Sequence, residues 1–260
     1  MSLCFIPTGG LGNLLFMHHA AYSYAKDNGM ELYAPAEHPT DRFTIFHYRK
    51  LFSHVKFLPF YPQPNYYDPI LAKYTPIPPG VNVISGFFQS FKYFSKYGTE
   101  IRDLLRSNEI DTWKEVNKTY NDLSNGKQTL CLHIRRGDAI GCKQYILLQE
   151  SYYLRASNIF TNCKFIVFSD EIEKVKDWNI WKSHDVHFVN EPDSIRAFFL
   201  MSLCDNFIIA NSTFSLSAYY MRENIQAKLI APKEWFGPEA VPPCNITVWD
   251  DLLPEEVILC

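Results

Sequence analysis

The chain has 260 residues, which is long enough for one large domain or two of moderate size. Hydrophobic residues make up 47% of it and charged residues 20%, a composition that fills a core and excludes a disordered chain. The formal net charge of −3 excludes a protein that depends on a basic face to bind nucleic acid.

The cysteines indicate reduced thiols. All seven are scattered along the chain without a Cys-x-x-Cys pair, a pattern that argues against a disulfide framework or a zinc site and favours a cytoplasmic protein. No apolar run reaches the length of a transmembrane helix, and Gly9 and Gly10 come too early for a signal peptide. The sequence indicates no particular oligomeric state.

The N-terminal stretch predicts a strand at residues 3–6, a glycine-rich turn at 9–13 and a helix at about 14–27. Such a unit lets a ligand approach the backbone amides at a helix N-terminus. The turn lacks the Gly-Lys-Ser/Thr of a Walker loop and does not match Gly-x-Gly-x-x-Gly. By pattern alone, an ordinary tight turn without a ligand accounts for it better.

The rest of the first half is less regular. Residues 61–80 are rich in proline and tyrosine and predict loops, and a helix is expected from about residue 90 to 105. Short strands are expected at 31–34, 54–60 and 81–85. The composition turns polar between residues 107 and 127, where we expect a domain boundary.

The second half alternates strands and helices, which predicts a parallel, doubly wound α/β sheet. The expected strands are 129–134, 164–168, 186–189, 207–210 and 228–230. The expected helices are 152–160, 172–178, 194–203 and one from about 215 to 222.

The strand at 129–134 runs directly into Arg135 and Arg136, followed by Gly137 and Asp138. Ligands of open α/β sheets lie beyond the carboxyl ends of the strands, and guanidinium groups there favour an anion such as phosphate. A surface loop with a salt bridge between Arg136 and Asp138 is the alternative.

Two other strands end in polar groups at the same predicted edge: Ser169 and Asp170 follow one, and residues 211–213 follow the other. Hydroxyls and free amides at a helix start form a phosphate cradle. Ordinary helix capping by Ser212 or Thr213 is the alternative, and both roles are compatible.

Seven stretches in one order closely resemble the α-1,2-fucosyltransferases, glycosyltransferase family 11. The most specific are His-x-Arg-Arg-Gly-Asp at 133–138 and Asn-Ser-Thr-Phe-Ser at 211–215. The stretches are 9–13, 86–94, 133–138, 168–170, 200–204, 210–215 and 231–236. The resemblance therefore covers most of the chain.

The resemblance implies an α/β, GT-B-like glycosyltransferase with two Rossmann-like lobes and the donor cleft between them. Residues 1–125 would form the acceptor-side lobe and residues 126–260 the nucleotide-sugar-binding lobe. The implied reaction moves L-fucose with inversion from GDP-fucose to a hydroxyl of a glycan acceptor, at O2 of galactose. No cofactor, metal or nucleic-acid partner is expected.

The resemblance also implies the roles of individual residues. Arg135 would grip the β-phosphate of the donor, and Asp138 would brace Arg135. His133 would face the nucleotide, and Asn13 would reach the donor from the other lobe. The remaining donor-binding residues implied are Arg136, Ser169, Asp170, Asp193, Asn211, Ser212, Thr213, Phe214 and Ser215.

This chemistry agrees with the residues present. Charge that builds on a diphosphate leaving group is met either by a divalent metal or by fixed cationic donors. Metal-using transferases commonly carry Asp-x-Asp; here no two aspartates have that spacing, and we interpret the stretches 109–111 and 191–193 as solvated turns. Inversion also calls for a base near the acceptor hydroxyl, which the sequence does not assign.

The chain departs from the family pattern at several positions. Leu14 and Met17 replace glutamines, residues 216–217 replace two tryptophans, and Ala197 replaces an aspartate that reads the guanine edge. Asp193, one helical turn before Ala197, is the substitute we consider. Two alternatives therefore stay open: a different nucleotide-sugar donor, or a non-catalytic glycan-binding descendant.

Overall fold

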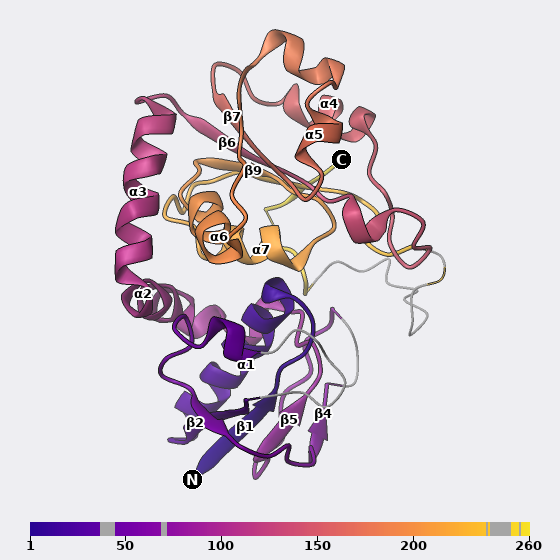
Figure 1. Ribbon diagram of the computed structural model, residues 1–260. Helices are drawn as coiled ribbons and strands as arrows, with labels where there is room; N and C mark the ends of the chain where they lie inside the picture. The colour runs from indigo at the N-terminus through magenta and orange to yellow at the C-terminus, as the bar shows by residue number, and fades with distance from the viewer. Residues whose placement is uncertain (37–44, 69–71, 238, 240–250, 255) are drawn as a thin grey trace. The chain divides into compact units, whose positions relative to one another are not determined.

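The computed structural model describes residues 1–36, 45–68, 72–237, 239, 251–254 and 256–260 (Figure 1). The chain forms two compact units, Met1–Ile110 with Val248–Pro254 and Asp111–Thr247 with Glu255–Cys260. Each unit contains its own parallel sheet flanked by helices.

The first unit is built on a sheet with the strand order β3-β2-β1-β5-β4, in which every neighbouring pair is parallel. The strands are β1 (Ser2–Ile6), β2 (Glu31–Pro35), β3 (Lys56–Leu58), β4 (Tyr66–Tyr67) and β5 (Val83–Ser85). The predicted strands at 31–34 and 81–85 are confirmed within a residue or two, and the one predicted at 54–60 is shorter. Strand β4 lies in the stretch predicted to be loop. The sequence does not predict it, because two residues are too few to show the alternation of a strand.

Helix α1 (Leu11–Asp27) connects β1 to β2 and is the main helix of the first unit. Leu14, Leu15 and Met17 are completely buried. Most of the other residues of α1 are also buried, and many of them are small or apolar. The helix ends where Gly29 adopts a φ of +60°, a left-handed conformation that glycine takes without strain. The predicted helix and its stop signal are both confirmed.

The expected helix from residue 90 is divided in the structure. Two short 3-10 turns, η2 (Phe91–Tyr93) and η3 (Ser95–Tyr97), precede α2 (Gly98–Asn108). A further 3-10 turn, η1 (Ile45–Tyr48), lies between β2 and β3.

Helix α3 (Ile110–Ser124) occupies most of the polar stretch at 107–127. The division between the two units falls inside that stretch, earlier than residue 125, because α3 packs with the second unit. The Trp113 ring lies edge-on to the Phe199 ring at 5.4 Å, and Arg196 donates to Glu115 over 2.7 Å. The polar composition thus reflects a helix with one exposed face.

The second unit has the strand order β11-β10-β9-β6-β7-β8, again parallel throughout. The strands are β6 (Thr129–Ile134), β7 (Lys164–Ser169), β8 (Asp185–Phe188), β9 (Asn206–Ile208), β10 (Leu229–Ala231) and β11 (Ile258–Leu259). The predicted doubly wound sheet is confirmed. The two-residue strand β11 was not predicted.

Helices cover both faces of this sheet (Figure 1). They are α4 (Glu150–Ser157), α5 (Ile172–Val175), α6 (Ser194–Ser202) and α7 (Thr213–Tyr220), with 3-10 turns η4 (Gly137–Ala139) and η5 (Asn179–Ser183). Every residue of β6 is buried, and successive side chains point to opposite faces. Leu130, Leu132 and Ile134 pack in the core with α4 and α5. Cys131 and His133 therefore face the other side, toward α6 and α7.

The strand order indicates where a ligand site is expected on this sheet. From β6 the chain moves outward to β7 and β8 and then returns to the other side of β6 as β9. The carboxyl ends of β6 and β9 therefore flank the point at which the strand order reverses, the usual ligand position in doubly wound sheets.

Candidate functional site

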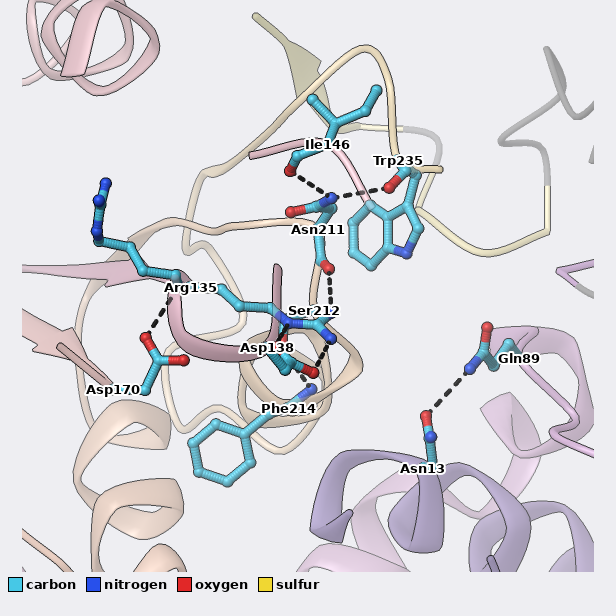
Figure 2. Close-up of polar contacts among 11 residues, drawn as sticks. Asn13, Gln89, Arg135, Asp138, Ile146, Asp170, Asn211, Ser212, Phe214 and Trp235 are labelled. Atoms are coloured by element: carbon cyan, nitrogen blue, oxygen red, sulfur yellow. Dashed lines mark hydrogen bonds and ion pairs between the residues drawn. The ribbon is translucent and has the colours of Figure 1, made fainter. Parts of the chain in front are cut away.

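Arg135 leaves the carboxyl end of β6 and is held from several directions (Figure 2). Its Nε and Nη2 atoms donate to the two carboxylate oxygens of Asp138 over 2.9 and 2.6 Å. Its Nη1 atom donates to the backbone carbonyl of Asn211 over 3.1 Å. The ring of Tyr145 lies against the guanidinium, with its centroid 4.1 Å from Cζ. The Arg135 side chain is only 18% exposed.

This arrangement fixes a cation at the strand end. The hydrogen bonds from Arg135 lower the pKa of the Asp138 carboxyl below its ordinary value, so the pair stays ionised at neutral pH. Three N–H groups of the guanidinium are used by Asp138 and Asn211. A planar guanidinium, which has five N–H groups in all, suits the oxygens of a phosphate.

Arg136 points to different partners from Arg135. Its Nε atom donates to Glu171 over 3.2 Å, and its guanidinium carbon lies 6.0 Å from the ring centroid of Trp178. The alternative salt bridge between Arg136 and Asp138 is therefore not formed, because Arg135 occupies both oxygens of Asp138. Glu171 was not singled out from the sequence, because no motif marks it.

Asp170, at the end of β7, fixes the turn that follows β6. Its Oδ1 atom accepts from the backbone N–H of Arg136 over 2.9 Å. A Cβ atom on Gly137 would lie 2.6 Å from Oδ2 of Asp170, so a larger residue here would displace that carboxylate. Ser169 accepts from the backbone N–H of Glu171 over 3.1 Å. The structure thus brings Ser169 and Asp170 to the edge where Arg135 lies, as predicted.

The stretch after β9 caps helix α7 and also binds the backbone of two other segments. Ser212 accepts from the backbone N–H of Phe214 over 3.3 Å and caps α7. The side-chain amide of Asn211 donates to the carbonyls of Ile146 and Trp235 over 3.0 and 2.8 Å. The capping alternative is confirmed for Ser212, while Thr213 is the first residue of the helix.

His133 lies beneath this edge and is 8% exposed. Its Nδ1 atom is 2.9 Å from Oγ of Ser215, and its ring lies 6.1 Å from that of Phe214. Burial, reinforced by the nearby charge of Arg135, lowers the pKa of His133 to about 3. The imidazole is therefore neutral at physiological pH.

Asp193 is the N-cap of α6. Its Oδ1 atom accepts from the backbone N–H groups of Ile195 and Arg196 over 2.8 and 3.3 Å. Glu191 accepts from the backbone N–H of Asp193 and from Arg196. These bonds occupy Oδ1 of Asp193, and the stretch 191–193 is the solvated turn that the sequence indicated. Ala197 lies 9% exposed on the same helix.

Asn13 belongs to the first unit. Its Oδ1 atom accepts from Nε2 of Gln89 over 3.2 Å (Figure 2). A Cβ atom on Gly9, whose φ is +76°, would lie 2.6 Å from Nδ2 of Asn13, so the turn requires glycine here. The Oε1 atom of Gln89 is buried and has no hydrogen-bond partner among the described residues. Gln89 and Asn13 link two of the motifs noted in the sequence.

The described residues contain no group of three or more His, Cys, Asp or Glu side chains arranged to hold a metal ion. No helix in the described part of the chain has the length and apolar character needed to cross a membrane.

Solved structures share this fold. The fucosyltransferase NodZ from Bradyrhizobium is 14% identical, with a TM-score of 0.53 and coverage of 87% of this chain and 96% of that chain. POFUT1 in complex with GDP is 13% identical, with a TM-score of 0.51 and coverage of 88% and 97%. The two α/β units, each with a parallel sheet, therefore have the GT-B-like fold of two Rossmann-like lobes.

Residues 70–239 match Glycosyl transferase family 11, and the chain belongs to this family. Among its relatives, the Alpha-1,2-colitosyltransferase of Escherichia coli is 31% identical over 59% of this chain. The O-antigen biosynthesis glycosyltransferase WbnK of Escherichia coli is 27% identical over 64% of this chain. The matched stretches span 56% and 59% of the length of those two relatives.

Proposed function

We propose that the protein is an inverting, metal-independent glycosyltransferase that moves L-fucose from GDP-fucose to a hydroxyl of a glycan acceptor, at O2 of galactose. The observation that carries the proposal is Arg135, held by Asp138, Asn211 and Tyr145 at the reversal point of the second sheet. Membership of family 11 supports the reaction class.

In this proposal Arg135 receives the negative charge of the departing diphosphate. As the bond between the sugar and the β-phosphate lengthens, charge builds on the phosphate oxygens, and a preorganised cation stabilises that charge without reorganisation. Asp138 and Asn211 hold the guanidinium in place before the substrate binds. The acceptor hydroxyl attacks from the opposite face of the sugar, which inverts the anomeric carbon.

GDP-colitose is the alternative donor that we propose to test. The relative with 31% identity is named as an Alpha-1,2-colitosyltransferase, and colitose differs from L-fucose in lacking the hydroxyl at C3. The arrangement around Arg135 serves either donor, because the diphosphate is the same. The position of Ala197, where the family pattern has an aspartate, makes the base of the donor a separate question for experiment.

The experiment offers GDP-fucose and GDP-colitose separately to the purified protein, together with galactose-terminated acceptors, and measures released GDP. Acceptor-dependent release from GDP-fucose supports the first proposal, and a strong preference for GDP-colitose supports the second. Binding of glycans without release from either donor would instead indicate a non-catalytic descendant. Thermal shifts with GDP, UDP, dTDP and ADP identify the base, because a ligand of the native state raises the melting temperature.

Arg135→Ala tests the site directly. We expect turnover to fall by about 10²–10³, the usual loss on removing one such donor. Arg155→Ala removes an exposed arginine from α4 of the same unit and serves as the matched control. Equal turnover in the two variants would remove Arg135 from the mechanism.

A further inference from the structure

Three segments that are distant in the sequence meet around Arg135. The amide of Asn211 ties the carbonyls of Ile146 and Trp235 together (Figure 2). Next to this tie, Tyr145 and Phe236 form an antiparallel bridge. The loop that carries Tyr145 is thus fixed to the strand end that also contacts Arg135.

The bridge depends on one glycine. The backbone N–H of Gly237 donates to the carbonyl of Gln144 over 2.8 Å. A Cβ atom on Gly237 would lie 2.2 Å from the carbonyl oxygen of Lys143, a distance that no side chain tolerates. Lys143 also pairs with Glu239 over 2.8 Å. The contacts on both sides of Tyr145 therefore fix the backbone from which its ring extends.

The ring of Tyr145 restrains Arg135 in a direction that the hydrogen bonds do not. The bonds from Arg135 to Asp138 and Asn211 run along the edges of the guanidinium. They set its position but resist tilting of its plane only weakly, because hydrogen bonds tolerate moderate changes of angle. Cζ of Arg135 lies over the Tyr145 ring, 4.1 Å from its centroid, and a ring this close limits movement of the guanidinium toward it.

We propose that Tyr145 is a positioning residue, which holds the plane of the Arg135 guanidinium in the orientation that binds the β-phosphate of the nucleotide. This inference rests on the proposed function, since it takes a nucleoside diphosphate as the ligand. Tyr145 acts through Arg135. Its removal therefore affects ligands that carry a β-phosphate and leaves ligands without one unchanged.

The test compares the dissociation constants of GDP and GMP for the wild type, Tyr145→Phe and Tyr145→Leu. We expect Tyr145→Leu to weaken GDP binding roughly tenfold, the size of a partly buried cation–π contact, and to leave GMP binding unchanged. Tyr145→Phe keeps the ring and loses only the hydroxyl that hydrogen-bonds to Arg135, so its GDP affinity should fall less than that of Tyr145→Leu. In transfer assays kcat should fall for the leucine variant while KM for the acceptor stays constant.

The outcomes separate the inference from the proposed function. A wild type that binds GDP no better than GMP contradicts the proposed function itself. A wild type that prefers GDP, together with an unchanged preference in Tyr145→Leu, overturns only the role of Tyr145. Equal losses for GDP and GMP would also overturn it, since they indicate a general distortion of the site. Tyr145→Gln repeats the comparison with a polar side chain, and Tyr67→Leu, at an exposed tyrosine of the first unit, is the control.

Discussion

The Nδ1 atom of His133 lies 2.9 Å from the hydroxyl oxygen of Ser215, and this contact joins β6 to α7 beneath the site. Ser215 is completely buried, and its hydroxyl also lies 3.3 Å from the carbonyl of Ser212. Because burial lowers the pKa of His133 to about 3, the imidazole remains neutral and cannot supply a second cation beside Arg135. Its contribution at neutral pH is hydrogen bonding and packing.

The first prediction concerns this contact. Ser215→Ala leaves the buried Nδ1 atom of His133 without its partner, and we expect a loss of about 1–3 kcal/mol in the free energy of unfolding. Urea denaturation measures the loss. Thr119→Ala, at an exposed position of α3, should change stability by less than about 0.5 kcal/mol. A Ser215→Ala variant as stable as the wild type would show that the contact adds nothing.

A second prediction separates two roles for Asp138. If Asp138 only orients Arg135, Asp138→Asn keeps one acceptor oxygen and the shape of the side chain, and kcat should fall by roughly tenfold. The shape of the pH profile should not change. The low pKa of Asp138, caused chiefly by its hydrogen bonds from Arg135, makes it a weak base.

The outcome that contradicts this is equally specific. A loss of about 10³ or more in Asp138→Asn, accompanied by the disappearance of an acidic limb in the pH profile, would assign Asp138 as the general base. Glu173→Gln, an exposed carboxylate of α5, provides the control for a change of charge on the same unit.

A third prediction follows from the use of a fixed cation. Since the proposed charge acceptor is Arg135, transfer should proceed at the same rate in excess EDTA as in added Mg²⁺ or Mn²⁺. Initial rates of GDP release under the three conditions provide the measurement. Activity that disappears with chelator and returns with either metal would overturn the metal-independent mechanism.

The sequence predicted most of the second unit because its signals are local. Strand β6 is a short apolar run that ends at two arginines, and α7 begins at a serine that caps it. Three strand ends carry polar residues whose convergence follows from parallel pairing alone. The contact of Arg135 with the carbonyl of Asn211 confirms that expectation.

The residues that the sequence did not reveal depend on tertiary contacts. Tyr145 lies in a loop whose position is set by Asn211 and by the bridge to Phe236, a residue far along the chain. Such a contact leaves no local pattern. Asp193 shows the converse, since its place just before α6 is a local capping signal and the structure confirms that it caps this helix. The sequence of helix α3 predicts a domain boundary and not a helix, because the residues of its exposed face are polar.

Three histidines of the first unit form a chain of close contacts, in which His18 and His19 are buried and His54 is partly exposed. Nδ1 of His18 lies 3.1 Å from Nδ1 of His19, and Nε2 of His18 lies 2.7 Å from Nε2 of His54. The amide of Asn108 completes the chain at 3.0 Å from Nδ1 of His54. Burial lowers the pKa of His19 to about 3 and that of His54 to about 4, and it lowers the pKa of His18 well below its ordinary value.

The fourth prediction is a loss of stability in mild acid. Above about pH 6.5 these histidines are neutral in both the folded and the unfolded chain. As the pH falls below that value, only the unfolded chain takes up protons. Each histidine should therefore lower the free energy of unfolding by about 1 kcal/mol between pH 6.5 and 5.5. Asp68 acts in the opposite direction, since burial raises its pKa to about 6. His19→Phe isolates one contribution: urea denaturation from pH 8 to 5 should give it a shallower decline than the wild type. Parallel curves for the two proteins would mean that His19 is protonated equally in the folded and unfolded chains.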